Sequence, residues 1–410
     1  MTATNPRAEV EFDHHSADFC ARNYEVMADL RARCPVAHTE AHGGYWVLTG
    51  YEPVEAALRD DDLFSSRPSV GIPASPIPAP LLPIESDPPL TRELRAVTAR
   101  HFTANAVRAL EPTIREMAGE LVDEFVERGE CDIAAELATP LPARTILAML
   151  GFAQHRWPEW VDCVHFLMHD RTTDEARTLA TAGKLFADIA EEVGRREANG
   201  LGDDLLSSIM RGRVEGRALD PLEVSMYTFT LFLAGMDTTS GLVGNALVRL
   251  DEDQDLRARL VADRGLLPAA TEEFLRHDTP VTGLARTVTR DAEFFGQHLR
   301  AGDPVLLMFA AANRDSGFVD RPDELDVDRP RVRHLAFGVG EHRCLGANLA
   351  TVLFQVMLDE ILTRLPDFRV TGPGERFPDA GETYALRHLP VAFTPGRRRV
   401  PRPARKSATV

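Results

Sequence analysis

The sequence predicts a mainly α-helical fold with a minor β portion. From about Asn105 onward apolar residues recur every three or four positions, as on one face of a helix, first at Val107, Leu110, Ile114, Met117, Leu121 and Phe125. Strand-like runs are short and lie at 45–48, 286–295 and 304–309. Because the chain shows no internal repeat and no obvious linker, we expect a single domain over residues 1–395.

Two segments are predicted to be irregular. Residues 66–89 carry repeated prolines, which forbid helix and sheet alike, so we expect a long loop there. Residues 396–410 are basic and contain two prolines, and we expect a disordered tail.

Composition excludes several classes of protein. Of the 410 residues 44% are hydrophobic and 27% charged, which is ordinary for a globular protein, and a net charge of -17 disfavours nucleic acid as a partner. We expect a cytoplasmic protein with no membrane segment, because no apolar run approaches the length of a membrane span and the first residues do not resemble a leader. Five scattered cysteines without a C-x-x-C pair predict reduced thiols.

A long helix is predicted from Asp220-Pro221 to about Leu250. Aspartate can cap a helix and proline is favoured at its first position, and the segment is apolar on nearly all sides, so it should run through the core. Its middle, residues 234–241 (AGMDTTSG), is unexpectedly rich in poor helix formers. Hydroxyls that divert carbonyls, and glycines that allow a flat ligand close, could open a groove in which dioxygen would fit.

Cys344 lies where a glycine-rich loop becomes an apolar helical pattern. Glycines at 338, 340 and 346 frame it. A helix N-terminus favours thiolate over thiol, and glycines allow backbone amides to approach the sulfur. This setting favours a thiolate at Cys344, with backbone amides close enough to tune its bond to a metal ion.

Two stretches carry a resemblance to a known family. Residues 337–350 (FGVGEHRCLGANLA) fill every fixed position of the F-G-x-G-x-H-x-C-x-G-x-x-L-A signature of cytochromes P-450, and residues 234–239 match its A-G-x-D-T-T motif. The resemblance implies the cytochrome P-450 fold, with a long central helix over a buried haem b whose iron is bound by the Cys344 thiolate. It also implies that Thr238 holds water and oxygen, while Asp237 relays protons from solvent.

The same resemblance implies further site residues. Arg95, Arg286 and His334 match positions that bind the haem propionates, whereas Thr91 stands where family members often have histidine. Glu273 and Arg276 resemble the E-x-x-R element, whose charge network Arg329 would join in a structural role.

The implied function is insertion of one oxygen atom from O₂ into a mainly hydrophobic small molecule, by hydroxylation or epoxidation, and we expect a place in secondary metabolism. Electrons would come from a separate ferredoxin and ferredoxin reductase, docking near Arg343 and Arg100. The alternatives are a peroxide-driven or bond-coupling haem-thiolate oxidase and a non-enzymatic haem sensor. The substrate pocket would be lined by the proline-rich loop, residues 232–233, 280–284 and 384–386.

One further pair of residues could bind metal. His165 and His169 lie four apart on a predicted helix, a spacing found in zinc sites, but the sequence offers no evident third ligand.

Overall fold

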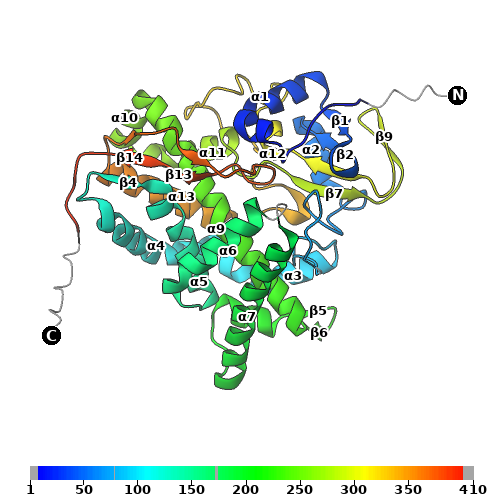
Figure 1. Ribbon diagram of the computed structural model, residues 1–410, viewed down its shortest axis with the longest axis horizontal. Helices are drawn as coiled ribbons and strands as arrows, with labels where there is room; N and C mark the ends of the chain where they lie inside the picture. The colour runs from blue at the N-terminus through cyan, green and yellow to red at the C-terminus, as the bar shows by residue number, and fades with distance from the viewer. Residues whose placement is uncertain (1–7, 78, 171–173, 400–410) are drawn as a thin grey trace.

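The computed structural model describes residues 8–77, 79–170 and 174–399 and confirms the mainly helical prediction. Helices fill the lower left of the molecule and the main sheet lies at the upper right, beside the N-terminus (Figure 1). The α-helices are α1 Ala17–Arg33, α2 Tyr51–Arg59, α3 Leu90–Thr98, α4 Ala104–Phe125, α5 Pro140–Leu150, α6 Trp157–His169, α7 Glu175–Asn199, α8 Leu205–Arg211, α9 Pro221–Glu252, α10 Gln254–Ala262, α11 Leu267–His277, α12 Phe309–Ala312 and α13 Ala347–Arg364.

The strands are short, as expected. They are β1 Val36–Thr39, β2 Tyr45–Leu48, β3 Phe64–Ser65, β4 Glu130–Asp132, β5 Arg213–Val214, β6 Arg217–Ala218, β7 Leu284–Val288, β8 Ala292–Phe294, β9 Gln297–Leu299, β10 Pro304–Leu307, β11 Arg369–Val370, β12 Glu375–Arg376, β13 Leu386–His388 and β14 Pro390–Ala392.

The largest sheet has the order β1-β2-β10-β7-β3, with β10 parallel to β2 and the other neighbours antiparallel. The predicted strand 286–295 is two strands. Its first half, β7, pairs with β10 and β3, whereas β8 turns away to form a hairpin with β9.

The long central helix forms as predicted. The Asp220 carboxylate accepts a hydrogen bond from the Glu223 N–H (2.9 Å), and the Glu223 carboxylate accepts one from the Asp220 N–H (2.8 Å). This reciprocal cap contributes about 1 kcal/mol. Helix α9 passes through the middle of the molecule (Figure 1) and packs against α5, α6, α7 and α13 in the principal apolar core.

The proline-rich segment is a loop without helix or strand in its described residues, as expected. The buried Glu85 carboxylate holds it in shape by accepting hydrogen bonds from the N–H groups of Val70 (3.0 Å) and Leu81 (2.7 Å). Buried acceptors of this kind replace the backbone pairing that proline removes.

The described start of the predicted tail is hydrogen-bonded rather than free. The Gly396 N–H donates to the Val126 carbonyl (2.8 Å), and Arg399 forms an ion pair with Glu360 on α13 (2.8 Å). Residues 400–410 lie outside the described residues. Over the described ranges, none of the helices combines the length and apolar character needed to cross a bilayer.

Candidate active site

Cys344 lies in a tight loop that ends at α13, as the glycine pattern predicted. Its N–H donates to the Phe337 carbonyl (2.7 Å), and α13 begins three residues later. Gly340 has φ of 76°, and a Cβ there would lie 2.6 Å from the Leu58 carbonyl oxygen. Only glycine therefore permits this loop to pass so close to α2.

The Cys344 side chain is accessible, although protein atoms surround it closely. Burial raises the pKa of its thiol, against the opposing effects of the Gly346 N–H, Arg95 and Arg343. A thiol in this setting becomes a thiolate when a metal ion binds it. The other four cysteines are also free thiols, and two of them, Cys131 and Cys163, are buried.

One turn of α9 faces an opening. Ala234 is exposed and Leu233, Gly235 and Thr238 are partly exposed, whereas the other residues of 226–247 are buried. The two are four residues apart and so share one face of the helix. The Thr238 hydroxyl donates a long hydrogen bond (3.2 Å) to the Ala234 carbonyl, which leaves its oxygen free to accept from a bound water.

Asp237 points away from that opening, toward α6. Its Oδ2 atom lies 2.6 Å from Nε2 of the buried His169, and its Oδ1 atom lies 3.5 Å from Nε2 of the partly exposed His165. The sequence offered no third ligand beside the His165–His169 pair, and in the structure the Asp237 carboxylate lies next to both histidines. Neither the position of this carboxylate nor its partners could be inferred from the motif.

The Asp237–His169 pair is a buried ion pair. Burial alone would raise the pKa of Asp237, but the His169 charge and the hydrogen bonds from the two histidines hold it far below its usual range. For His169 burial has the opposite effect and lowers the pKa. Asp237 raises that pKa by more, so the net pKa of His169 is raised. His169 is fixed further by a hydrogen bond to the Asp379 carbonyl (3.0 Å) and by stacking on Phe377 (3.8 Å between centroids).

The glycines of α9 serve packing against protein, which corrects the sequence-based interpretation of a groove for a flat ligand. A Cβ on Gly235 would lie 3.2 Å from the Ile146 side chain, and one on Gly241 would lie 3.1 Å from Ala385. Small residues at these positions let α5 and the segment before β13 approach the helix closely. The helix itself continues without a break.

Two cations near the Cys344 loop have no carboxylate partner among the described residues. Arg286 is 3% exposed and donates to the Ala285 carbonyl, and burial lowers its pKa to about 10. Arg95 donates to the Arg343 carbonyl (2.6 Å), and burial lowers its pKa too. A buried guanidinium without a counter-charge is costly, so these side chains fit the carboxylates of a haem.

His342 lies near Arg286 and Arg95, although it was not predicted from the sequence as a site residue. Burial, followed by Arg286 and Arg95, lowers its pKa to about 4, and its Nε2 atom lies 3.0 Å from the Ser66 hydroxyl. The histidine of the F-G-x-G-x-H-x-C signature was the signal that could have found it. His334 lies instead near Glu272 (3.9 Å), and burial lowers its pKa.

Thr91, which stands where the family often has histidine, bonds to the proline-rich loop. Its buried hydroxyl donates to the Ser86 carbonyl and also contacts the Ser86 hydroxyl (2.8 Å). It therefore fastens α3 to the proline-rich loop.

The E-x-x-R element forms the expected network. Arg276, fully buried, pairs with Glu273 through two hydrogen bonds of 2.8 and 2.7 Å, and Glu273 also accepts from Arg329 (3.2 Å). Arg276 further donates to the carbonyls of Asn313, Pro322 and Glu324. Its role is to hold these segments together.

A small cavity of about 60 Å³, partly open to solvent, lies between the proline-rich loop and helices α6, α7 and α9. Ile77, Leu81, Phe229 and Leu233 give it a mainly apolar lining, with Glu85 and Glu382 among its polar groups. Of the expected pocket segments, the proline-rich loop and Leu233 line this cavity, whereas 280–284 and 384–386 do not. Those two segments lie side by side, because Val281 pairs with Thr383.

Comparison with known proteins agrees with these features. Residues 142–390 match the cytochrome P-450 family model. The chain is 34% identical to cyclomarin C epoxidase CymV of Salinispora arenicola, over 90% of this chain and 95% of that one. It is 32% identical to the steroid C26-monooxygenase of Mycobacterium tuberculosis, over 89% and 99%. The structure of cytochrome P-450 CYP109Q5 from Chondromyces apiculatus superposes with a TM-score of 0.84 at 30% identity, covering 95% of this chain and 99% of that one. The chain belongs to the cytochrome P-450 family of haem-thiolate monooxygenases.

Proposed function

We propose that this monooxygenase inserts one oxygen atom from O₂ into a mainly hydrophobic small molecule, by hydroxylation or epoxidation, in secondary-metabolite biosynthesis. The observation that carries the substrate class is the largely apolar lining of the cavity beside Phe229 and Leu233. One relative is named as an epoxidase of cyclomarin C, which supports the proposed kind of substrate.

Haem b supplies the iron at which dioxygen is reduced and cleaved, and thiolate ligation favours that cleavage. We propose Cys344 as the iron ligand, because it is the accessible cysteine in the glycine-framed loop. Arg95 and Arg286 would bind the haem propionates, because each is a cation without a carboxylate partner in the described structure. We propose the same propionate-binding role for His342, in addition to His334, the histidine expected from the sequence.

The protein's part in oxygen chemistry is to hold water and deliver protons. The partly exposed Thr238 hydroxyl is placed to hold a water in the opening above α9. His165, whose side chain is 23% exposed, stands between solvent and the buried Asp237 carboxylate. We propose that Asp237 helps to relay protons from solvent on the side of α9 where His165 lies, while His169 keeps that carboxylate oriented.

Electrons are proposed to come from a separate ferredoxin served by a ferredoxin reductase. Arg343, in the Cys344 loop, and Arg100 are both exposed and would attract an acidic partner. The Arg343 backbone is tied to Arg95 beside the proposed haem site, so docking there would place the partner near the iron.

The test is a visible-absorption titration of the purified ferric protein with a library of hydrophobic metabolites. Turnover of each ligand with reductant, ferredoxin and reductase follows the titration. Ligand-induced spin shifts and product formation that needs both reductant and O₂ are the expected results. Turnover with peroxide alone would favour the peroxide-driven oxidase, and ligand binding without any product would favour a haem sensor.

A further inference from the structure

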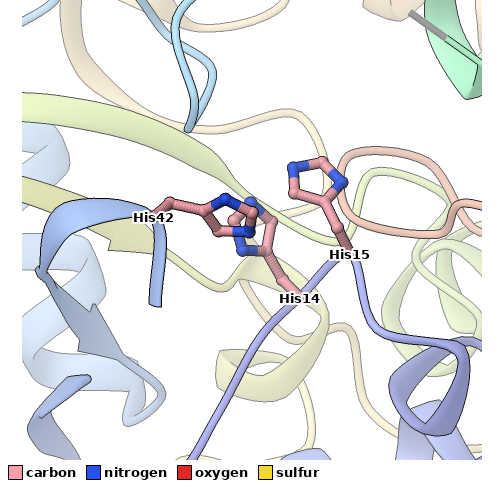
Figure 2. Close-up of side chains that lie close together, drawn as sticks. All are labelled: His14, His15 and His42. Atoms are coloured by element: carbon pink, nitrogen blue, oxygen red, sulfur yellow. The ribbon is translucent and has the colours of Figure 1, made fainter. Parts of the chain in front are cut away.

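Three histidines that take no part in the proposed oxygen chemistry gather at the N-terminal side of the molecule. His14 and His15 precede α1, and His42 lies in the turn between β1 and β2. Their ring centroids are 4.0 Å apart for His14 and His15, 5.4 Å for His15 and His42, and 5.8 Å for His14 and His42. One ring nitrogen from each lies within 4.8 Å of the other two, and Figure 2 shows the three imidazoles grouped together.

Each ring is held through at least one of its nitrogens. His14 Nδ1 bonds to the Tyr45 hydroxyl, His42 Nε2 to the Asp13 carboxylate and His15 Nδ1 to the Asp379 carboxylate, each at 2.8 Å. Metal-binding histidines are fixed in this way, because an acceptor on one nitrogen sets the tautomer and turns the other nitrogen toward the ion.

The opposite nitrogens are the candidate ligands. No hydrogen bond joins His14 Nε2 or His42 Nδ1 to any residue that the structure describes. His15 Nε2 lies 2.6 Å from the Ile72 carbonyl oxygen, so its proton is the one that a metal ion would displace. The Ile72 oxygen could then serve as a further ligand or be replaced by water.

One side of the histidine cluster is open to solvent, so a metal ion could reach it. His14 is 1% exposed, whereas the His42 side chain is 26% exposed and sits in a turn with Gly43 and Gly44. Tetrahedral zinc needs ligand nitrogens about 3.4 Å apart, and the three candidate nitrogens lie within 4.8 Å of one another.

We propose that His14, His15 and His42 form a binding site for a divalent transition-metal ion, with Zn²⁺ as the matching ion. Three imidazoles favour zinc, copper or nickel over magnesium and calcium, which prefer oxygen ligands. The ion would fasten the segment before α1 to the β1–β2 turn and, through Asp379, to the loop before β13.

Zinc binding to the haem-loaded protein tests the proposal. After treatment with a chelator and desalting, the protein is titrated with Zn²⁺ by calorimetry, and bound metal is counted by mass spectrometry. We expect one zinc per chain and a rise in melting temperature. His42→Asn should weaken binding about 100-fold or more, since asparagine tolerates the left-handed φ of 51° but is a poor zinc ligand. Asp379→Asn should weaken it about 10-fold to 100-fold by releasing His15.

Two matched variants make the test specific. His298→Asn removes an exposed histidine on β9 that also pairs with a carboxylate, and His165→Asn removes one of the two histidines beside Asp237. Both should bind zinc like the parent protein. The proposal is overturned if the parent binds no zinc at micromolar concentration. It is also overturned if His42→Asn binds zinc as well as the parent does, or if either control variant loses zinc, because the metal would then be an adventitious ion only.

Discussion

Replacing Arg286 by methionine should stabilise the haem-free protein and weaken its hold on haem. The guanidinium is buried on β7, and no described carboxylate lies within ion-pair distance of it. Burial lowers its pKa to about 10. Because each pKa unit is worth 1.36 kcal/mol, burying this charge costs the folded haem-free protein about 3 kcal/mol.

Methionine has a similar length and no charge, so Arg286→Met removes this cost. In the haem-loaded protein a propionate would supply the counter-charge, and its loss should weaken haem binding by about the same energy, or roughly 100-fold. The melting temperatures of the two haem-free proteins measure the first effect, and the rate of haem transfer to an acceptor protein measures the second.

Arg276→Met is the matched control. Arg276 is also buried, but it pairs with Glu273 and with three backbone carbonyls. Its removal leaves Glu273 without its main partner, so this variant should lose about 3 kcal/mol or more with or without haem. If Arg286→Met destabilises the haem-free protein in the same way, or retains haem like the parent, the propionate role of Arg286 is wrong.

Three further predictions concern protons and electrons. Thr238→Ala should keep haem and reductant consumption but divert electrons to peroxide, and unchanged coupling of product to reductant would refute its role. The stability that His169 gains from Asp237 is complete below the ordinary histidine pKa and declines as pH rises through the raised pKa. The melting-temperature deficit of His169→Gln should therefore be larger at pH 6 than at pH 9, and an equal deficit would contradict a charged pair. Arg343→Glu should slow electron transfer from ferredoxin at low salt and reduce its salt dependence, whereas no change would remove Arg343 from the docking surface.

The central helix and the cysteine loop could be predicted because their signals are local. Asp220 and Pro221 are adjacent and form the cap that the pattern implied. Gly338 and Gly340 adopt positive φ beside Cys344, where the sequence placed a tight loop. Short-range geometry of this kind follows from neighbouring residues alone.

The partners of Asp237 could not be predicted, because they come from another helix. His165 and His169 precede it by about seventy positions, and only the packing of α6 on α9 brings them together. The sequence offered no third group beside this histidine pair, and the structure places the Asp237 carboxylate there. The glycines of α9 were misinterpreted for the same reason, since Ile146 and Ala385 approach them only in the folded chain.

The most direct test of the central claim is the absorption spectrum of the reduced protein with carbon monoxide, recorded for the parent and for Cys344→His. If Cys344 binds the iron, the parent shows the red-shifted Soret band of thiolate-bound haem and the variant loses it. A histidine-like band in the well-folded parent, or an unchanged band in the variant, would contradict the assignment of Cys344.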